Sequence, residues 1–120
     1  MQSTFSTATG NLNAVNDAVT VDVRAHDSVA IMLVGSSAVM TISFEASVDG
    51  TTWVALAAVS LASTTTTTAV VSVANPTTGV WVVGPDRLAA VRWVRARNSA
   101  DTSGTCVGTI YAGASGVYAA

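Results

Sequence analysis

Residues 40–56, MTISFEASVDGTTWVAL, decide the fold because they predict a β-hairpin. Between residues 40 and 48 apolar and polar side chains alternate, and in a strand this alternation puts one set on each face. The apolar set is Met40, Ile42, Phe44, Ala46 and Val48. Asp49-Gly50 tolerates the positive φ angles of a tight hairpin turn, so the chain is expected to reverse there and return through Trp53.

The length of that turn sets which side chains face each other. With a two-residue turn, Ala46 faces Trp53 and Phe44 faces Ala55, and this is the register that we expect. A turn one residue longer would bring Leu56 opposite Phe44 and send Trp53 to the far face, because a slip of one residue inverts a strand.

The rest of the chain predicts more short strands and no long helix. Residues 29–34 form a continuous apolar run, expected to be a central strand covered on both sides. Breakers separate the strands, and Gly35-Ser36-Ser37 and residues 101–104 are interpreted as turns. One helical turn is expected after Asp86, which is placed to cap it. The expected strands besides the hairpin are residues 18–24, 29–34, 68–73, 80–83, 91–98 and 105–112.

About eight short strands at this spacing are typical of a β-sandwich or a small barrel. We therefore expect an all-β protein with a single antiparallel β-sandwich, jelly-roll or immunoglobulin-like, in residues 17–112. Residues 1–16 are interpreted as an extended N-terminal arm anchored by Phe5 and Leu12, and residues 113–120 as a C-terminal tail that carries Tyr118. Both arms are expected to lie across neighbouring subunits.

The composition favours contacts with proteins over other partners. The 120 residues contain five arginines, seven acidic residues and no lysine, with a formal charge of −2. This charge is too small and too mixed to favour nucleic acid as a partner. No apolar run approaches the roughly 18 residues that span a bilayer, so we expect a soluble product of the cytoplasm and no membrane partner. A neutral surface rich in Ser, Thr and Ala is typical of proteins that pack on proteins.

The sequence contains few residues of the types that catalysis, cofactor binding or metal binding requires. The single histidine, His26, lies in an expected turn, and the single cysteine, Cys106, is interpreted as a small core residue. Glu45, the only glutamate, is expected to be a cross-strand partner of an arginine. We therefore expect no catalytic, cofactor-binding or metal-binding residues, and a protein that is not an enzyme.

One group of side chains indicates an interface. Trp93, Arg95 and Arg97 alternate with Val94 and Ala96, so they should share an outward face, and Trp81 and Arg87 are further candidates for this group. Tryptophan and arginine are enriched at interface hot spots, whereas the alternative is a solvated face. The residues expected at protein interfaces are Phe5, Leu12, Trp93, Arg95, Arg97 and Tyr118.

The hairpin sequence Phe44-Glu45-Ala46-Ser47-Val48-Asp49-Gly50-Thr51-Thr52-Trp53, with Val91-Arg92-Trp93-Val94-Arg95-Ala96-Arg97 and Ser103-Gly104-Thr105 after it, resembles small β-sandwich virion proteins of tailed bacteriophages. These include capsid decoration (cement) proteins and tail or fibre components. The resemblance implies a structural protein of the virion that is added in many copies to the head exterior. Its partners would be the major capsid protein, other virion proteins and copies of itself. The alternative is a module of a tail or fibre that binds host glycan or serves tail assembly.

Overall fold

The computed structural model describes residues 6–24, 26–62 and 69–113. In these ranges it contains eight strands and one four-residue helix. The chain is an all-β sandwich, as expected. The elements are β1 (Ser6–Asn11), β2 (Ala18–Asp22), β3 (Ser28–Ser47), β4 (Val54–Ala55), β5 (Val59–Ser60), β6 (Ser72–Ala74), β7 (Gly79–Val83), α1 (Pro85–Leu88) and β8 (Trp93–Gly113).

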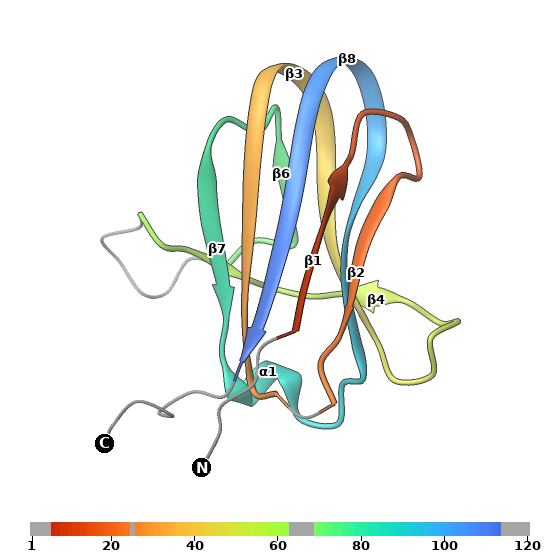
Figure 1. The fold of residues 1–120 in the computed structure, drawn as a ribbon, viewed down its shortest axis with the longest axis vertical. Coiled ribbons are helices and arrows are strands. Elements are labelled where there is room, and N and C mark those ends of the chain that lie inside the picture. The colour runs from red at the N-terminus through yellow and green to blue at the C-terminus, as the bar shows by residue number, and fades with distance from the viewer. Residues whose placement is uncertain (1–5, 25, 63–68, 114–120) are drawn as a thin grey trace.

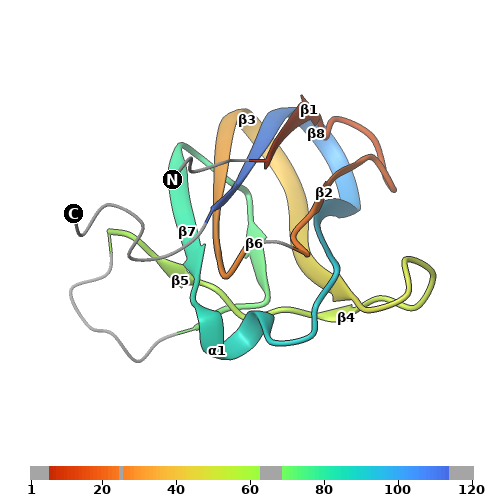
Figure 2. The ribbon, with the colours of Figure 1, turned by 60° about the horizontal axis from the view of Figure 1, so that its bottom comes forward.

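Two long strands organise the sandwich. β3 has 20 residues and β8 has 21, and they pair antiparallel from Ser28↔Gly113 to Ser47↔Trp93. Figures 1 and 2 show both strands side by side, and in Figure 1 both arch over the top of the molecule. Each long strand therefore belongs to two layers.

We call these layers 1 and 2. Layer 1 contains β1, the second half of β8, the first half of β3, β7 and β5, in that order. Layer 2 contains β2, the first half of β8 and the second half of β3, which also pairs with β4 and β6. Because the layers share two strands, their outer faces are fixed relative to each other.

β3 and β8 each bend where the sequence predicted a turn. Gly35-Ser36-Ser37 and residues 101–104 do not reverse the chain; they lie inside β3 and β8, where the pairing register shifts between Ser36 and Met40. Ser37 has φ 49° and Gly104 has φ 88°. Residues with turn propensity make a bulge here, and a bulge bends a strand while the ladder continues beyond it.

The first half of β3 also differs from the prediction. Residues 29–34 were expected to be covered on both faces, but burial alternates along them, and Val34 is 43% exposed. Among the residues that the structure describes, only the face toward layer 2 is covered.

The hairpin adopts the longer of the two turns. Glu45 pairs with Ala55 and Ala46 with Val54, and the Leu56 amide donates to the Phe44 carbonyl at 2.9 Å. The preferred two-residue register is therefore wrong.

Side chains inside the turn explain its length. Ser47 Oγ accepts a hydrogen bond from the Gly50 amide at 2.8 Å, and Asp49 Oδ1 accepts from the Thr51 and Thr52 amides at 2.8 Å each. The backbone hydrogen bonds from Thr52 and Thr51 hold the pKa of Asp49 far below its ordinary value of 3.8. These bonds stabilise a wider loop, with Gly50 at φ 81°. Val48, expected on the buried face of the strand, belongs to this loop and is 64% exposed, because β3 ends at Ser47.

The core fills the space between the layers and includes part of the expected arm. Ser6–Asn11 is not an arm in this structure but forms β1, which pairs with β8 from Ser6↔Ala112 to Asn11↔Val107. Leu12 is fully buried. The other large side chains that are fully buried are Phe44, Ile31, Leu33, Ile42, Ile110, Val23, Val94, Asn98 and Cys106.

The remaining elements match the prediction in part. β7 lies where it was expected, and α1 is a single helical turn as expected but begins earlier, at Pro85. The N-cap of α1 is Gly84, without a side-chain hydrogen bond, so Asp86 lies in the first turn and does not cap it. Of the strand predicted at residues 68–73, only its end belongs to β6, and Val70 forms an isolated bridge with Ala58.

Candidate functional site

The outer face of layer 2 carries the arginine and tryptophan side chains that the sequence singled out. Along the first half of β8, Val94 and Ala96 are fully buried, whereas Trp93, Arg95 and Arg97 are half-buried on the other side. The predicted alternation is therefore confirmed. β8 is central in layer 2, with β2 on one side and β3 on the other, so this face is held from both sides.

Glu45 holds two of these arginines in place. It lies opposite Arg95 in the β3–β8 ladder, and Arg95 Nε donates to Glu45 Oε1 at 2.7 Å. Arg97 Nε donates to the same oxygen at 3.0 Å and its Nη2 to Oε2 at 3.1 Å. Burial raises the pKa of Glu45, but the hydrogen bonds from Arg97 and Arg95 outweigh it and lower the pKa below 4.5. The expected cross-strand pair is confirmed.

Trp53 belongs to the same cluster, although the two-residue turn preferred from the sequence would have placed it opposite Ala46, on the other face. The guanidinium carbon of Arg95 lies 4.0 Å from the centroid of the Trp53 ring. This contact needs Trp53 on the outer face, which only the longer turn provides. The sequence signal was the pair Ser47 and Asp49, whose side chains can bond to the turn backbone.

A groove lies beside this cluster at the hairpin turn. It has a volume of about 350 Å³ and is lined by Thr20, Asp49, Gly50, Trp53, Arg92 and Trp93. The guanidinium carbon of Arg92 lies 5.4 Å from the centroid of the Trp93 ring. A methyl group at Gly50 would come within 3.2 Å of Trp93 Nε1, so the turn packs closely on this ring.

Other residues predicted at interfaces lie elsewhere. Leu12 is a core residue, 0% exposed, and so offers no surface to a neighbouring subunit. Phe5 and Tyr118 lie outside the described residues. Trp81 does not join the cluster, because it lies on β7 in layer 1, with its ring centroid 5.9 Å from that of Phe44.

The single histidine and the single cysteine are held by contacts within the fold. His26 lies in a turn, and its Nε2 is 3.0 Å from Ser6 Oγ. Cys106 is buried, and burial raises the pKa of its thiol. The described residues hold no group of three or more His, Cys, Asp or Glu side chains able to bind a metal ion. In the same ranges, no helix has the length and apolarity needed to cross a membrane.

Comparison with known proteins defines the class by its fold. No family model and no curated protein matches the sequence. Among solved structures, the SPBc2 prophage-derived protein YomS is similar, with a TM-score of 0.66 and 16% identity over 93% of this chain and 97% of YomS. The PBSX exported protein XepA is similar with a TM-score of 0.65 and 13% identity, over 90% of this chain and 38% of XepA. At these identities the likeness shows a shared β-sandwich fold.

Proposed function

We propose that this chain is a structural protein of a tailed-phage particle, that it decorates the capsid exterior, and that it is not an enzyme. The observation that carries the proposal is the Trp53, Trp93, Arg95 and Arg97 cluster on the outer face of layer 2. The fold shared with a prophage-derived protein and the sequence resemblance to phage virion proteins support it.

The cluster suits a protein contact because it is rigid before binding. Arg95 lies between the Trp53 ring and Glu45, and Arg97 donates to Glu45 and, at 3.1 Å, to Asn16 Oδ1. Side chains already held in one rotamer lose less entropy when a partner covers them. Tryptophan and arginine in such positions dominate interface energies.

On a repeating lattice, many copies can bind stably through contacts that are individually weak. A self-associating protein that binds a shell at many sites gains avidity without a tight single contact. A decoration protein working in this way stabilises the shell by linking neighbouring subunits.

The test uses phage particles that lack this protein and are then incubated with purified chain. Trp53→Ala and Arg95→Ala should each reduce the amount that co-sediments with particles by about 10-fold or more, in line with hot-spot truncations. The matched control is Val48→Ala, because Val48 is an exposed apolar residue of the same hairpin at 64% exposure. Thermal unfolding must show that each variant is folded. Full occupancy with folded Trp53→Ala would contradict the proposal.

A second candidate function rests on the groove. A cavity that combines two tryptophan rings with Asp49, Arg92 and the Thr20 hydroxyl has the aromatic and hydrogen-bonding groups that recognise sugars. The chain would then be a host-glycan module of a tail or fibre. Copy number distinguishes the two: a decoration protein is among the abundant proteins of a purified particle, whereas a fibre module is scarce. Glycan binding that Arg92→Ala abolishes would favour the module.

A further inference from the structure

The outer face of layer 1 is free of charge. The segments that build this layer are β1, residues 28–36 of β3, β5, β7 and residues 104–113 of β8, and they contain no Asp, Glu, Arg, Lys or His. The arginine and glutamate side chains described above lie instead on the outer face of layer 2. The two outer faces of the sandwich therefore have different chemistry.

The ladder registers arrange the outward side chains of layer 1 in three rows. Each row crosses from β1 through β8 to β3, and two of the rows continue onto β7. The rows are Thr7, Tyr111, Ala30 and Val82; Thr9, Thr109, Met32 and Val80; and Asn11, Val107 and Val34. Tyr111 is 44% exposed, Val34 43%, Val107 39% and Val82 36%. A contiguous apolar surface of this kind on a folded chain indicates an interaction site.

The two polar side chains at the centre of these rows have partners within the face, whereas Thr7 and Asn11 lie at its edge on β1. Thr9 and Thr109 share a hydrogen bond of 2.9 Å between their hydroxyl oxygens, and Thr9 Oγ1 lies 3.2 Å from the Gly108 carbonyl. Hydroxyl groups that already have partners can leave water at little cost.

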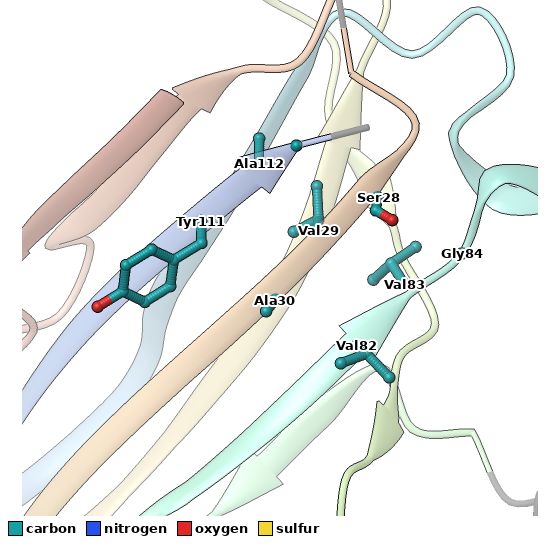
Figure 3. A pocket seen from close by; sticks show the side chains of 9 residues that line it. Ser28, Val29, Ala30, Val82, Val83, Gly84, Tyr111 and Ala112 are labelled. Atoms are coloured by element: carbon teal, nitrogen blue, oxygen red, sulfur yellow. The ribbon is translucent and has the colours of Figure 1, made fainter. Parts of the chain in front are cut away.

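The shape of the face is a ridge between two hollows. One hollow, of about 360 Å³, lies between Tyr111, Ala30 and Val82, and Figure 3 shows these three side chains on adjacent strands. The second hollow, also of about 360 Å³, lies on the other side of Tyr111 against Thr7 and Thr9. The Tyr111 ring thus separates two depressions of similar size.

We propose that a second copy of this chain docks on this face through a two-fold axis, with Tyr111 of each copy in a hollow of the other. A two-fold interface requires a surface complementary to itself, and a ridge beside a hollow offers both halves of such a contact. A face without charge gives no complement to a charged partner, whereas a second copy presents the same neutral apolar surface.

The available area suits a reversible dimer. β1 contributes six residues to this face, residues 104–113 of β8 ten, residues 28–36 of β3 nine and β7 five. At about 3.3 Å per residue and about 4.8 Å between strands, the face covers roughly 480 Å² per copy. Two copies would bury about 950 Å², the size of a weak, transient interface. We therefore expect a dimer with a dissociation constant in the micromolar range.

This inference does not depend on the phage role. The dimer uses layer 1 and the proposed particle contact uses layer 2, so loss of one contact leaves the other intact. A dimer would expose two Trp/Arg clusters, which is the arrangement that increases avidity on a lattice.

The experiment is sedimentation equilibrium of the purified chain from about 1 to 200 µM, a range chosen to span a micromolar dissociation constant. Tyr111→Arg and Val82→Arg each place two equal charges in the interface and should weaken self-association by about 100-fold or more. The matched control is Val71→Arg, because Val71 is an exposed valine, 47% exposed, outside layer 1. It should dimerise like the unmodified chain.

Methyl NMR spectra supply a second measurement. The resonances of Val34, Val82 and Val107 should shift with protein concentration, while those of Val71 and Val48 stay constant. Three results would overturn the inference: a monomer throughout the concentration range, a dimer that both arginine substitutions leave unchanged, or capture of another virion protein by layer 1 without self-association. Unfolding curves of each variant exclude a general loss of structure.

Discussion

The shared bend of β3 and β8 predicts that Gly104→Ala destabilises the whole sandwich. Gly104 has φ 88°, and a methyl group on its Cα would lie 2.2 Å from the Ser37 carbonyl oxygen and 2.6 Å from Ala38 Cα. These are backbone atoms of the partner strand, so no side-chain rotation can relieve the contact. The two strands would have to separate where both pass from one layer to the other.

The cost has two parts. An alanine at positive φ costs about 1–2 kcal/mol relative to its normal conformation. Forcing strands apart by overpacking costs about 1–3 kcal/mol more. The free energy of unfolding should therefore fall by about 2–5 kcal/mol, a large share of the 5–15 kcal/mol typical of a domain. With an unfolding entropy of about 0.25 kcal/mol/K for 120 residues, Tm should fall by about 8–20 °C.

The assay is urea and thermal unfolding followed by tryptophan fluorescence and circular dichroism. Gly10→Ala is the control, because its added methyl group would meet only a side-chain atom, Val19 Cγ2, at 3.3 Å, and its φ is not positive. The control should change stability by less than about 1 kcal/mol. If Gly104→Ala were no less stable than Gly10→Ala, the close crossing of the two strands would be wrong.

Three further predictions concern the core and the ion pairs. Leu12→Ala should lower the free energy of unfolding in urea by about 2–5 kcal/mol, because Leu12 is fully buried; an unchanged value would mean that it belongs to a free arm. Glu45→Gln should cost about 1–3 kcal/mol at pH 7, because Arg95 and Arg97 lose a charged acceptor; equal stability would show that the pairs contribute nothing. The lowered pKa of Glu45 adds stability that is complete above its ordinary value of 4.5 and is lost as the pH falls through the folded value. Urea midpoints measured from about pH 5 to pH 3 should therefore fall more steeply for the unmodified chain than for Glu45→Gln.

Local patterns predicted much of the structure. The alternation in residues 40–46 and 93–98 predicted the buried and exposed faces of both strands, because neighbouring side chains of a strand point to opposite sides. The prediction failed at Val48, which was expected on the buried face but is 64% exposed, because β3 ends at Ser47. Glu45 and the arginines followed from the same periodicity, since opposite charges on one outer face pair across the ladder.

The wrong predictions concern residues whose local structure depends on contacts with segments far away in the sequence. Gly35-Ser36-Ser37 and residues 101–104 have turn composition, yet both continue their strands through a bend because the two bulges face each other across the ladder. Leu12 lies in a stretch without period and is buried only because β1 pairs with the far end of the chain.

The sequence by itself determined the class, an all-β sandwich with a low-charge surface and an Arg/Trp strand face. Only the tertiary structure decided that two strands belong to both layers, that Trp53 stacks on Arg95, and that an uncharged face lies on the layer opposite the charged one. The physical reason is the separation of the interacting residues along the sequence. Side-chain alternation is a property of adjacent residues. The bend depends instead on atoms such as Ser37 O and Gly104 Cα, which meet only when the chain has folded.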